Sequence, residues 1–308
     1  TDIEYTVLHY VERVDSGINP ETESSGGTFV TMTDSSGTER IYYLYAAVTY
    51  RDGIADSVQT MNDRLMDCGE ASMHTLSIDG FDLADFNEYE YLIEADGSTV
   101  IRWYYNRADV IVRYDGNGGT ASEAETSAKY GSCFGTLATA VRDGYTFDGW
   151  YTEAHGGTEV TADQICMEPE EMTLYAHWKA RGDIPYTVYH RTQNLVGNIV
   201  SEPHDLTNTT LLQTEVLYGT SDGTADLYCM AVEGFTGCPD NFYQVYIDAD
   251  GTAAATLYYD RIFTTVRYDA NGGMIPSDAD LRTKVYYEGV MGALPAQPQR
   301  KGYLFSGW

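Results

Sequence analysis

Short segments in which apolar and polar residues alternate recur along the chain, and turn-forming residues separate them. Successive side chains of a strand point to opposite faces, so this alternation is typical of half-buried strands. Such segments lie around residues 5–10, 110–114, 129–130, 174–178 and 186–190. Two more segments, 88–94 and 99–105, flank the pair Asp96-Gly97, and Asp250-Gly251 repeats the pattern. Because this pair tolerates positive φ, we predict a hairpin at each position.

Two other segments have the spacing of helices rather than strands. An amphipathic helix is predicted by apolar residues at helical spacing, namely Ile54, Val58, Met61 and Leu65. Thr161 and Gln164 have capping-box spacing and predict a short helical turn through Ile165. Many strands with a short helix per module predict a β-rich α+β fold.

The chain contains nearly two copies of a pair of modules, because four motifs return in the same order. The matching segments are 5–10 and 186–191, 96–107 and 250–261, 112–119 and 266–273, and 144–150 and 302–308. The repeats divide the chain into module A1 (1–109), module B1 (110–180), module A2 (181–262) and module B2 (263–308).

The copies differ in length. A1 is about 27 residues longer than A2, and we place this insertion between Tyr45 and Met73, at the predicted helix. The simplest interpretation is a helix packed on its own module, and a partner-binding helix is the alternative. B2 has no counterpart of residues 151–178, so we expect an open core with unpaired strand edges. The chain starts at Thr1 without a signal peptide, and we interpret it as a piece of a longer protein.

Module B resembles the Listeria–Bacteroides repeat, the B-repeat of internalin-type surface proteins. The resemblance rests on Tyr114 to Gly119, Gly144 to Tyr151 and Leu174 to Trp178. The anchor residues of this repeat are here Gly144, Tyr145, Phe147, Gly149, Trp150, Tyr175, Trp178 and, in B2, Trp308. Module A is similar to MucBP-like repeats through Tyr-Thr-Val, Gly-Phe at 80–81 and 234–235, and Tyr-Tyr-x-Arg. Both resemblances imply ubiquitin-like (β-grasp) modules of secreted, wall-attached bacterial proteins, and neither brings catalytic residues.

Composition narrows the range of partners. The net charge is −29, with 47 acidic and 18 basic residues, which disfavours nucleic acid and anionic membrane surfaces as partners. The apolar fraction of 43% is that of a globular chain, and no run of 18 apolar residues is present.

No motif predicts catalysis, a cofactor or a metal site. The chain has no nucleophile elbow, HExxH, P-loop or GxGxxG motif. The segments beginning at Asp115 and Asp248 resemble half of a calcium loop but lack its closing Glu. His9 and His190 occupy matching positions, which indicates a packing role rather than a ligand role.

Five cysteines are too few for a disulfide scaffold of this size. Cys229 and Cys238 flank Gly234-Phe235 and form one candidate disulfide, and Cys133 and Cys166 of B1 form a second. Cys68 has no obvious mate.

The predicted function is that of an extracellular bacterial surface repeat region, either an adhesin stalk or spacer or a protein-interaction module. A glycan-binding module, suggested by the abundant Tyr and Trp, and an accessory region of a surface enzyme are the alternatives. The expected partners are a host or matrix protein or glycan and neighbouring repeats of the same longer chain. We expect a monomer with no nucleic-acid or membrane contact.

Short junctions between modules predict an elongated array. A compact chain of this length would have a radius of gyration of about 19 Å, whereas four modules in line would give about 35 Å. Small-angle scattering on the isolated chain distinguishes the two, and a value at or below about 22 Å would contradict the array.

Overall fold

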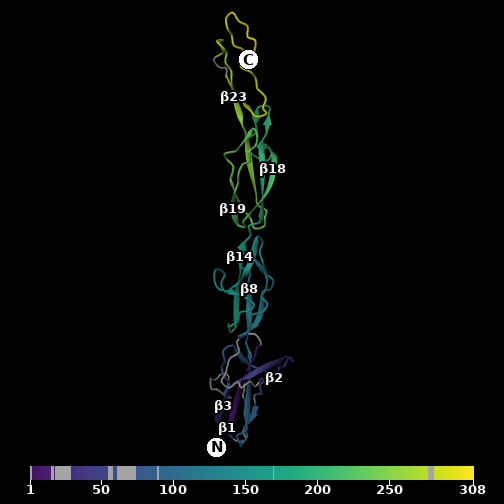
Figure 1. The fold of residues 1–308 in the computed structure, drawn as a ribbon, viewed down its shortest axis with the longest axis vertical. Coiled ribbons are helices and arrows are strands. Elements are labelled where there is room, and N and C mark those ends of the chain that lie inside the picture. The colour runs from purple at the N-terminus through teal and green to yellow at the C-terminus, as the bar shows by residue number, and fades with distance from the viewer. Residues whose placement is uncertain are drawn as a thin grey trace. The chain divides into compact units, whose positions relative to one another are not determined.

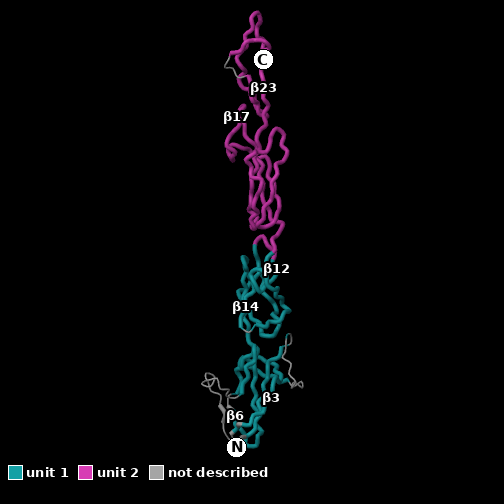
Figure 2. Tube along the Cα trace, turned by 90° about the vertical axis from the view of Figure 1, so that its left-hand side faces the viewer, with its two compact units in different colours: residues 1–142, 147–178 teal, residues 143–146, 179–308 magenta. Residues whose placement is uncertain are grey.

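The computed structural model describes residues 2–14, 17, 29–54, 58–60, 74–88, 90–168, 170–276 and 281–308. In these residues the regular structure consists of strands, without a helix (Figure 1). The β-rich expectation is therefore confirmed, and the helical part of the α+β expectation is not. The chain divides into two compact units, residues 1–142 with 147–178 and residues 143–146 with 179–308 (Figure 2).

Module A1 is built on a five-stranded sheet in the order β2-β3-β1-β7-β5. Its strands are β1 (Asp2–Glu12), β2 (Phe29–Thr33), β3 (Glu39–Ile54), β5 (Phe81–Leu83) and β7 (Val100–Arg107). β1 pairs antiparallel with β3 and parallel with β7, with Thr6 opposite Val100. The first and last long strands of the module therefore lie side by side in the middle of the sheet.

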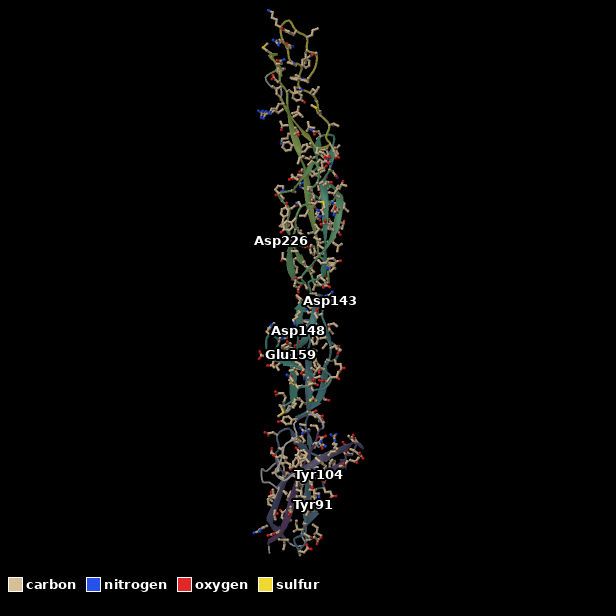
Figure 3. All side chains as sticks on the ribbon, in the orientation of Figure 1. Tyr91, Tyr104, Asp143, Asp148, Glu159 and Asp226 are labelled. Atoms are coloured by element: carbon tan, nitrogen blue, oxygen red, sulfur yellow. The ribbon has the colours of Figure 1, made fainter. Side chains whose placement is uncertain are left out.

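Apolar side chains cover both faces of this sheet, because successive residues of β7 point to opposite sides. Trp103 is fully buried on one face and meets the ring of Tyr91 edge to face, with ring centres 6.1 Å apart. Tyr104 lies on the other face and stacks on Tyr10 at 5.2 Å. Tyr91 and Tyr104 are labelled in Figure 3. Burial on both faces explains why Trp103 to Tyr105 form a continuous apolar run instead of alternating.

Module A2 repeats the central part of this sheet, in the order β18-β15-β22-β20. The strands are β15 (Ile184–Gln193), β18 (Thr209–Gly219), β20 (Phe235–Gly237) and β22 (Ala254–Arg261). β15 is antiparallel to β18 and parallel to β22, as β1 is to β3 and β7. Two small ladders join β16 (Leu195–Val196) to β17 (Ile199–Val200) and β19 (Gly223–Asp226) to β21 (Gln244–Ile247).

Module B1 has a second five-stranded sheet, in the order β10-β8-β14-β12-β13. Its strands are β8 (Asp109–Asp115), β10 (Glu125–Lys129), β12 (Tyr145–Tyr151), β13 (Glu159–Val160) and β14 (Glu171–Ala180), beside a ladder of β9 (Thr120–Ala121) and β11 (Ala140–Val141). β8 alternates strictly between buried and exposed residues, and it pairs in parallel with β14. The strands expected at 110–114, near 129 and at 174–178 are confirmed.

Module B2 retains the antiparallel pair of β23 (Phe263–Arg267) and β24 (Arg282–Tyr286), which corresponds to β8 and β10. Among its described residues, no strand takes the place beside β23 that β14 takes beside β8. A hollow of about 300 Å³ lies against β23 and β24, lined by residues that include Phe263, Val266 and Met291.

The hairpins predicted at the two Asp-Gly pairs are wrong. Gly97 makes a tight turn with a φ of +76°, but the strands on either side of it join different sheets. β6 (Glu90–Leu92) pairs with β4 (Val58–Thr60), whereas β7 pairs with β1 and β5. In A2, β21 and β22 are separated in the same way. Turn chemistry fixes only the reversal of the chain, and the distant N-terminal strand takes the following strand as its partner.

Neither predicted helix is found in the described residues. Of the four positions of the expected amphipathic helix, Ile54 ends β3 and Val58 lies in β4, and Met61 and Leu65 lie outside the described residues. At the second site one of the two capping-box bonds forms, since Thr161 N–H donates to Gln164 Oε1 at 3.1 Å, whereas Gln164 N–H donates to the backbone carbonyl of Thr161 at 3.1 Å and not to its hydroxyl. The turn stops there because Ile165 pairs with Cys133 in a β-bridge.

The insertion of A1 is split between two places, not confined to 46–72. Tyr42 lies opposite Glu12 as Thr209 lies opposite Gln193, yet 30 positions separate the first pair and 16 the second. About half of the extra residues therefore precede β3 and include β2. The offsets between the repeated motifs at the two ends of the A modules give the total number of extra residues in A1. Only the strand pairing shows where along the chain these residues lie.

The tryptophan of the Gly-Tyr-x-Phe-x-Gly-Trp motif packs alike in both B modules. Trp150 is 2% exposed, lies 4.7 Å from Tyr114 and 5.3 Å from Phe147, and donates its indole N–H to Ala138 O at 2.7 Å. Trp308 repeats this with Tyr268 at 5.2 Å, Phe305 at 5.4 Å and Pro295 O at 3.0 Å. Both tryptophans thus pack against their own module, whereas Tyr303 is 68% exposed, since residues 303–308 form no strand.

Replacing Trp150 by Ala should lower the free energy of unfolding of unit 1 by about 3–5 kcal/mol, as for other large truncations in a core. Trp308→Ala in the open module B2 is the matched control, and its effect should be much smaller. Urea denaturation followed by circular dichroism measures both. An unchanged midpoint for Trp150→Ala would contradict its role as the centre of the B1 core.

Candidate functional site at the module junctions

A single buried guanidinium joins modules A1 and B1. Arg107 ends β7, and β8 begins after only one further residue. Arg107 Nε donates to Glu12 O in A1 at 3.2 Å, and its Nη1 donates to Tyr130 O in B1 at 2.7 Å. Burial lowers the pKa of Arg107, yet an arginine stays charged in proteins. Charge-assisted bonds of this kind are stronger than neutral ones, so they restrain both backbones.

Aromatic rings and a glycine complete the junction. The guanidinium carbon of Arg107 lies 5.0 Å from the ring centre of Phe81, and the Phe81 and Tyr130 rings meet edge to face at 6.4 Å. Gly80 has a φ of +75°, and a Cβ at this position would lie 2.1 Å from Cδ1 of Tyr130. Only glycine therefore provides both this backbone conformation and the space for the ring.

The same junction recurs between A2 and B2. Arg261 Nε donates to Gln193 O at 2.9 Å, and Nη1 donates to Tyr287 O at 2.9 Å. The guanidinium lies 4.8 Å from the ring centre of Phe235, and a Cβ at Gly234 would lie 2.2 Å from Tyr287. Arg, Phe, Gly and Tyr thus occupy equivalent places in both module pairs.

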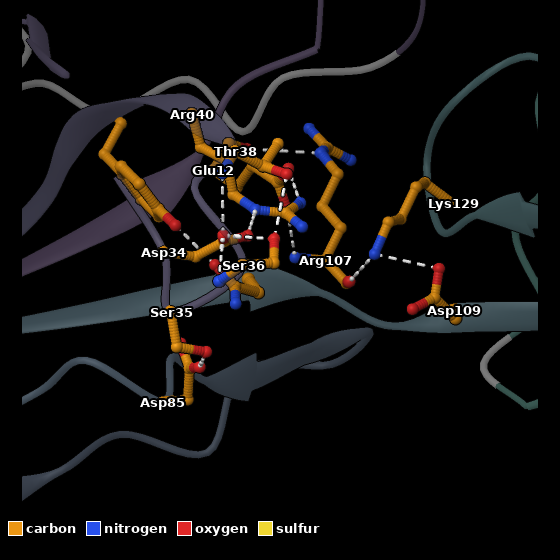
Figure 4. A network of polar contacts seen from close by, with 12 residues as sticks. Glu12, Asp34, Ser35, Ser36, Thr38, Arg40, Asp85, Arg107, Asp109 and Lys129 are labelled. Atoms are coloured by element: carbon orange, nitrogen blue, oxygen red, sulfur yellow. Dashed lines mark hydrogen bonds and ion pairs between the residues drawn. The ribbon is translucent and has the colours of Figure 1, made fainter. Parts of the chain in front are cut away.

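The two junctions differ in charge. In the first, Glu12 accepts a bond from the backbone N–H of Arg107 at 2.8 Å and pairs with Arg40 at 2.7 Å (Figure 4). Lys129 pairs with Asp109 at 2.8 Å beside the same contact. In the second, the neutral Gln193 accepts from the backbone N–H of Arg261 at 3.2 Å, and the carboxylate of Glu288 pairs with Arg261 Nη1 at 2.8 Å. The geometry of the junction therefore does not require a carboxylate at the position of Glu12.

The Asp-x-Asn-Gly-Gly motif of B1 forms hydrogen bonds to the closing strand of its module, β14. Asp115 accepts the backbone N–H of Asn117 at 2.8 Å, which makes an Asx turn. Asn117 has a φ of +44° and donates its amide to Ala176 O at 3.0 Å. Trp178 donates its indole N–H to Gly116 O at 3.0 Å. These bonds give the motif a structural role, as its incomplete resemblance to a calcium loop suggested.

His9 and His190 have the packing role predicted from their repetition. Both are buried, and their Nδ1 atoms lie 3.1 Å from Tyr105 Oη and 2.7 Å from Tyr259 Oη. Burial lowers the pKa of His9 to about 4, with a smaller contribution from the charge of His74.

The structure places all four described cysteines as free thiols, so neither candidate disulfide is formed. Cys133 and Cys166 lie in B1, and Cys229 and Cys238 lie in A2. Cys68 lies outside the described residues. Within the described part of the chain, one group of side chains has its donor atoms close enough to share a metal ion, namely His204, Cys238 and Asp260.

Sequence reasoning missed both the junctions and this group. The signal for the junctions was present, because Arg107 and Arg261 close the repeated Tyr-Tyr-x-Arg motif and Gly-Phe is repeated at 80–81 and 234–235. What the repeats do not show is that the two motifs meet. For His204 no signal existed, since it has no counterpart in A1.

The B modules match a known family. Residues 111–177 and 265–308 match the sequence profile of the Listeria-Bacteroides repeat domain. These segments cover less than half of the chain, and they confirm the resemblance expected for both B modules.

Three further proteins are similar to parts of the chain. A protein of Evansella cellulosilytica described as a Gly-rich membrane protein is 28% identical over 184 residues, and the match covers 54% of this chain and 19% of that protein.

In the described residues, no helix has the length and apolar character needed to cross a bilayer.

Two solved structures overlap with the chain at low similarity. The Bacillus anthracis TIE protein is 8% identical with a TM-score of 0.28, and the match covers 85% of this chain and 51% of that one. The pilus adhesin SpaC of Lactobacillus rhamnosus GG is 9% identical with a TM-score of 0.21, and the match covers 84% and 44%. TM-scores of this size establish no shared fold.

Proposed function

We propose that this chain is a repeat region of a bacterial cell-surface protein, in which each A–B pair is a stiff building block of an extracellular spacer or interaction region. The observation that carries the proposal is the recurrence of the Arg-Phe-Gly-Tyr junction in both pairs. A junction buried to this degree couples two small modules into one mechanical unit. The Listeria-Bacteroides match of both B modules supports placement at the cell surface.

We further propose that the A modules are MucBP-like and that the modules are variants of the ubiquitin-like (β-grasp) fold. Support comes from the parallel pairing of the first and last long strands in A1, B1 and A2. The glycan-binding alternative loses the support of the tryptophans, because Trp103 and Trp150 are buried and Trp178 and Trp308 donate their indole N–H groups within their own modules. Exposed tyrosines such as Tyr218 and Tyr228 keep it as the second candidate function.

Surface placement predicts that antibodies against the chain label intact cells of the bacterium that produces it. Brief treatment of the cells with an external protease should remove the label, because an exposed spacer is accessible from outside. Immunofluorescence before and after permeabilisation measures this. Labelling that needs permeabilisation would contradict the proposal.

Gly80→Ala should uncouple A1 from B1, and Gly135→Ala in B1 is the matched control. Both glycines have left-handed φ, at +75° and +72°, so both variants lose about 1–2 kcal/mol from backbone strain. A Cβ meets nothing within 4 Å at Gly135 but the ring of Tyr130 at Gly80. The Gly80 variant should therefore lose a further ~1–3 kcal/mol through overpacking.

Hydrogen exchange gives the local readout. Ala108 N–H donates to Gly80 O at 2.9 Å, and Tyr130 N–H donates to Ala108 O at 3.0 Å. Mass spectrometry should show faster exchange of these two amides in Gly80→Ala and unchanged exchange in Gly135→Ala. Equal exchange in the two variants would mean that the Tyr130 ring does not hold the modules together.

A further inference from the structure

His204 is held in one orientation on the face of the A2 sheet that carries Tyr258, which corresponds to the Tyr104 face of A1. Its Nε2 lies 2.6 Å from Asp260 Oδ1, so the imidazole donates its Nε2–H to this carboxylate. The ring also rests against Tyr258, with ring centres 5.6 Å apart. The bond to Asp260 leaves Nδ1 as the nitrogen with a free lone pair.

Two further donor atoms converge on Nδ1. Cys238 Sγ lies 3.9 Å from it, and Glu202 Oε2 lies 3.5 Å from it. Glu202 is itself positioned, because its other oxygen accepts a bond from Gln193 Nε2 at 2.7 Å. Cys238 is 3% exposed and is fixed at the end of β20 by its backbone N–H, which donates to Tyr258 O at 2.9 Å.

From this arrangement we infer a zinc site in module A2, formed by His204 Nδ1, Cys238 Sγ and Glu202 Oε2, with Asp260 orienting the histidine from behind. Zinc takes thiolate, imidazole and carboxylate ligands at about 2.0–2.3 Å in a tetrahedron, which puts pairs of donor atoms about 3.5 Å apart. His204 Nδ1 lies 3.9 Å from Cys238 Sγ and 3.5 Å from Glu202 Oε2, and the Glu202 side chain, which is 58% exposed, has to turn toward Cys238 to complete the site. A carboxylate that accepts the second ring N–H is the usual support of a zinc-bound histidine.

Module A1 shows what the same place looks like without such a site. Ala84 stands where A2 has Cys238, as shown by the equivalent bonds from Ala84 N–H to Tyr104 O and from Cys238 N–H to Tyr258 O, both 2.9 Å. Asn106 stands where A2 has Asp260, and Tyr42 fills the remaining space and donates its hydroxyl to Asn106. In A2 the residue opposite Gln193 is the smaller Thr209, and Gln193 binds Glu202, two residues before His204.

A nucleophilic Cys-His-Asp triad is the competing interpretation of these residues. Burial raises the pKa of the Cys238 thiol, and the neighbouring carboxylates Asp240, Asp260 and Glu202 oppose its ionisation further. A protonated, enclosed thiol is a poor nucleophile for an external substrate. A bound cation reverses this situation, because it stabilises the thiolate directly.

The site would stiffen the A2–B2 junction, since Gln193, which holds Glu202, also binds Arg261 through its carbonyl and its side-chain oxygen. Metal binding is measured independently of the surface role proposed above, so either proposal can fail alone.

The test titrates the reduced, metal-free 308-residue chain with Co²⁺ and then with Zn²⁺ in competition with a chromophoric chelator. We expect one ion per chain and a sulfur-to-cobalt charge-transfer band, and zinc should raise the unfolding temperature of unit 2. Cys238→Ser should abolish the band, and Cys229→Ser, in the same module, should retain it. Asp260→Asn should keep the band and weaken zinc binding by about 10–100-fold.

His204→Gln provides a second ligand variant in case Cys238→Ser fails to fold, and circular dichroism without metal reports folding of each. Absence of the band in the parent chain, or its persistence in Cys238→Ser and His204→Gln, would overturn the zinc site. A Cys229–Cys238 disulfide in protein isolated from cells without reductant would overturn it as well, because no thiolate would remain.

Discussion

The parallel pairing of the first and last long strands in the middle of the sheet is the constraint on which A1, B1 and A2 depend. β1 with β7, β8 with β14 and β15 with β22 all follow this pattern. A central strand contributes hydrogen bonds on both edges and side chains to the core, so each module is complete only when its C-terminal strand is inserted. In module B2, β23 has one described partner, β24.

This topology also produces the junctions. Because the last strand of an A module is central, its final residue emerges from the middle of the sheet, directly beneath the first strand of the B module. Arg107 and Arg261 are those final residues, and their side chains reach backbone carbonyl groups on both sides. Repulsion among the many carboxylates acts over the surface, but buried, charge-assisted bonds are little weakened by it or by salt.

The two A modules share their central strands but carry different side chains on one face of the sheet, the face of Tyr104 in A1 and of Tyr258 in A2. In A1 that face is closed by Tyr10, Tyr42 and Tyr104, whose rings pack against one another. In A2 the equivalent space holds His204, Cys238 and Asp260. A repeat can exchange aromatic packing for a polar group here because the central strands are already fixed by the core on the opposite face.

The repeats, the β-rich composition and the positions of most strands followed from the sequence, because alternation and repeated motifs are local properties. The Listeria-Bacteroides match of the B modules also rested on local motifs. The helix near residue 58 did not follow, because apolar spacing over a few residues fits a helix as well as a strand. The strand was decided by pairing with β6, more than 30 positions away.

By itself, the sequence determined which residues are turns, strands and core anchors, since these depend on neighbours along the chain. Only the tertiary structure decided that the Asp-Gly turns separate two sheets, that about half of the A1 insertion precedes β3, and that Arg107 meets Tyr130. The grouping of His204 with Cys238 and Asp260 belongs to the same class, because these residues lie 22 to 56 positions apart. Such contacts depend on which strands pair across long loops, and no local pattern encodes that choice.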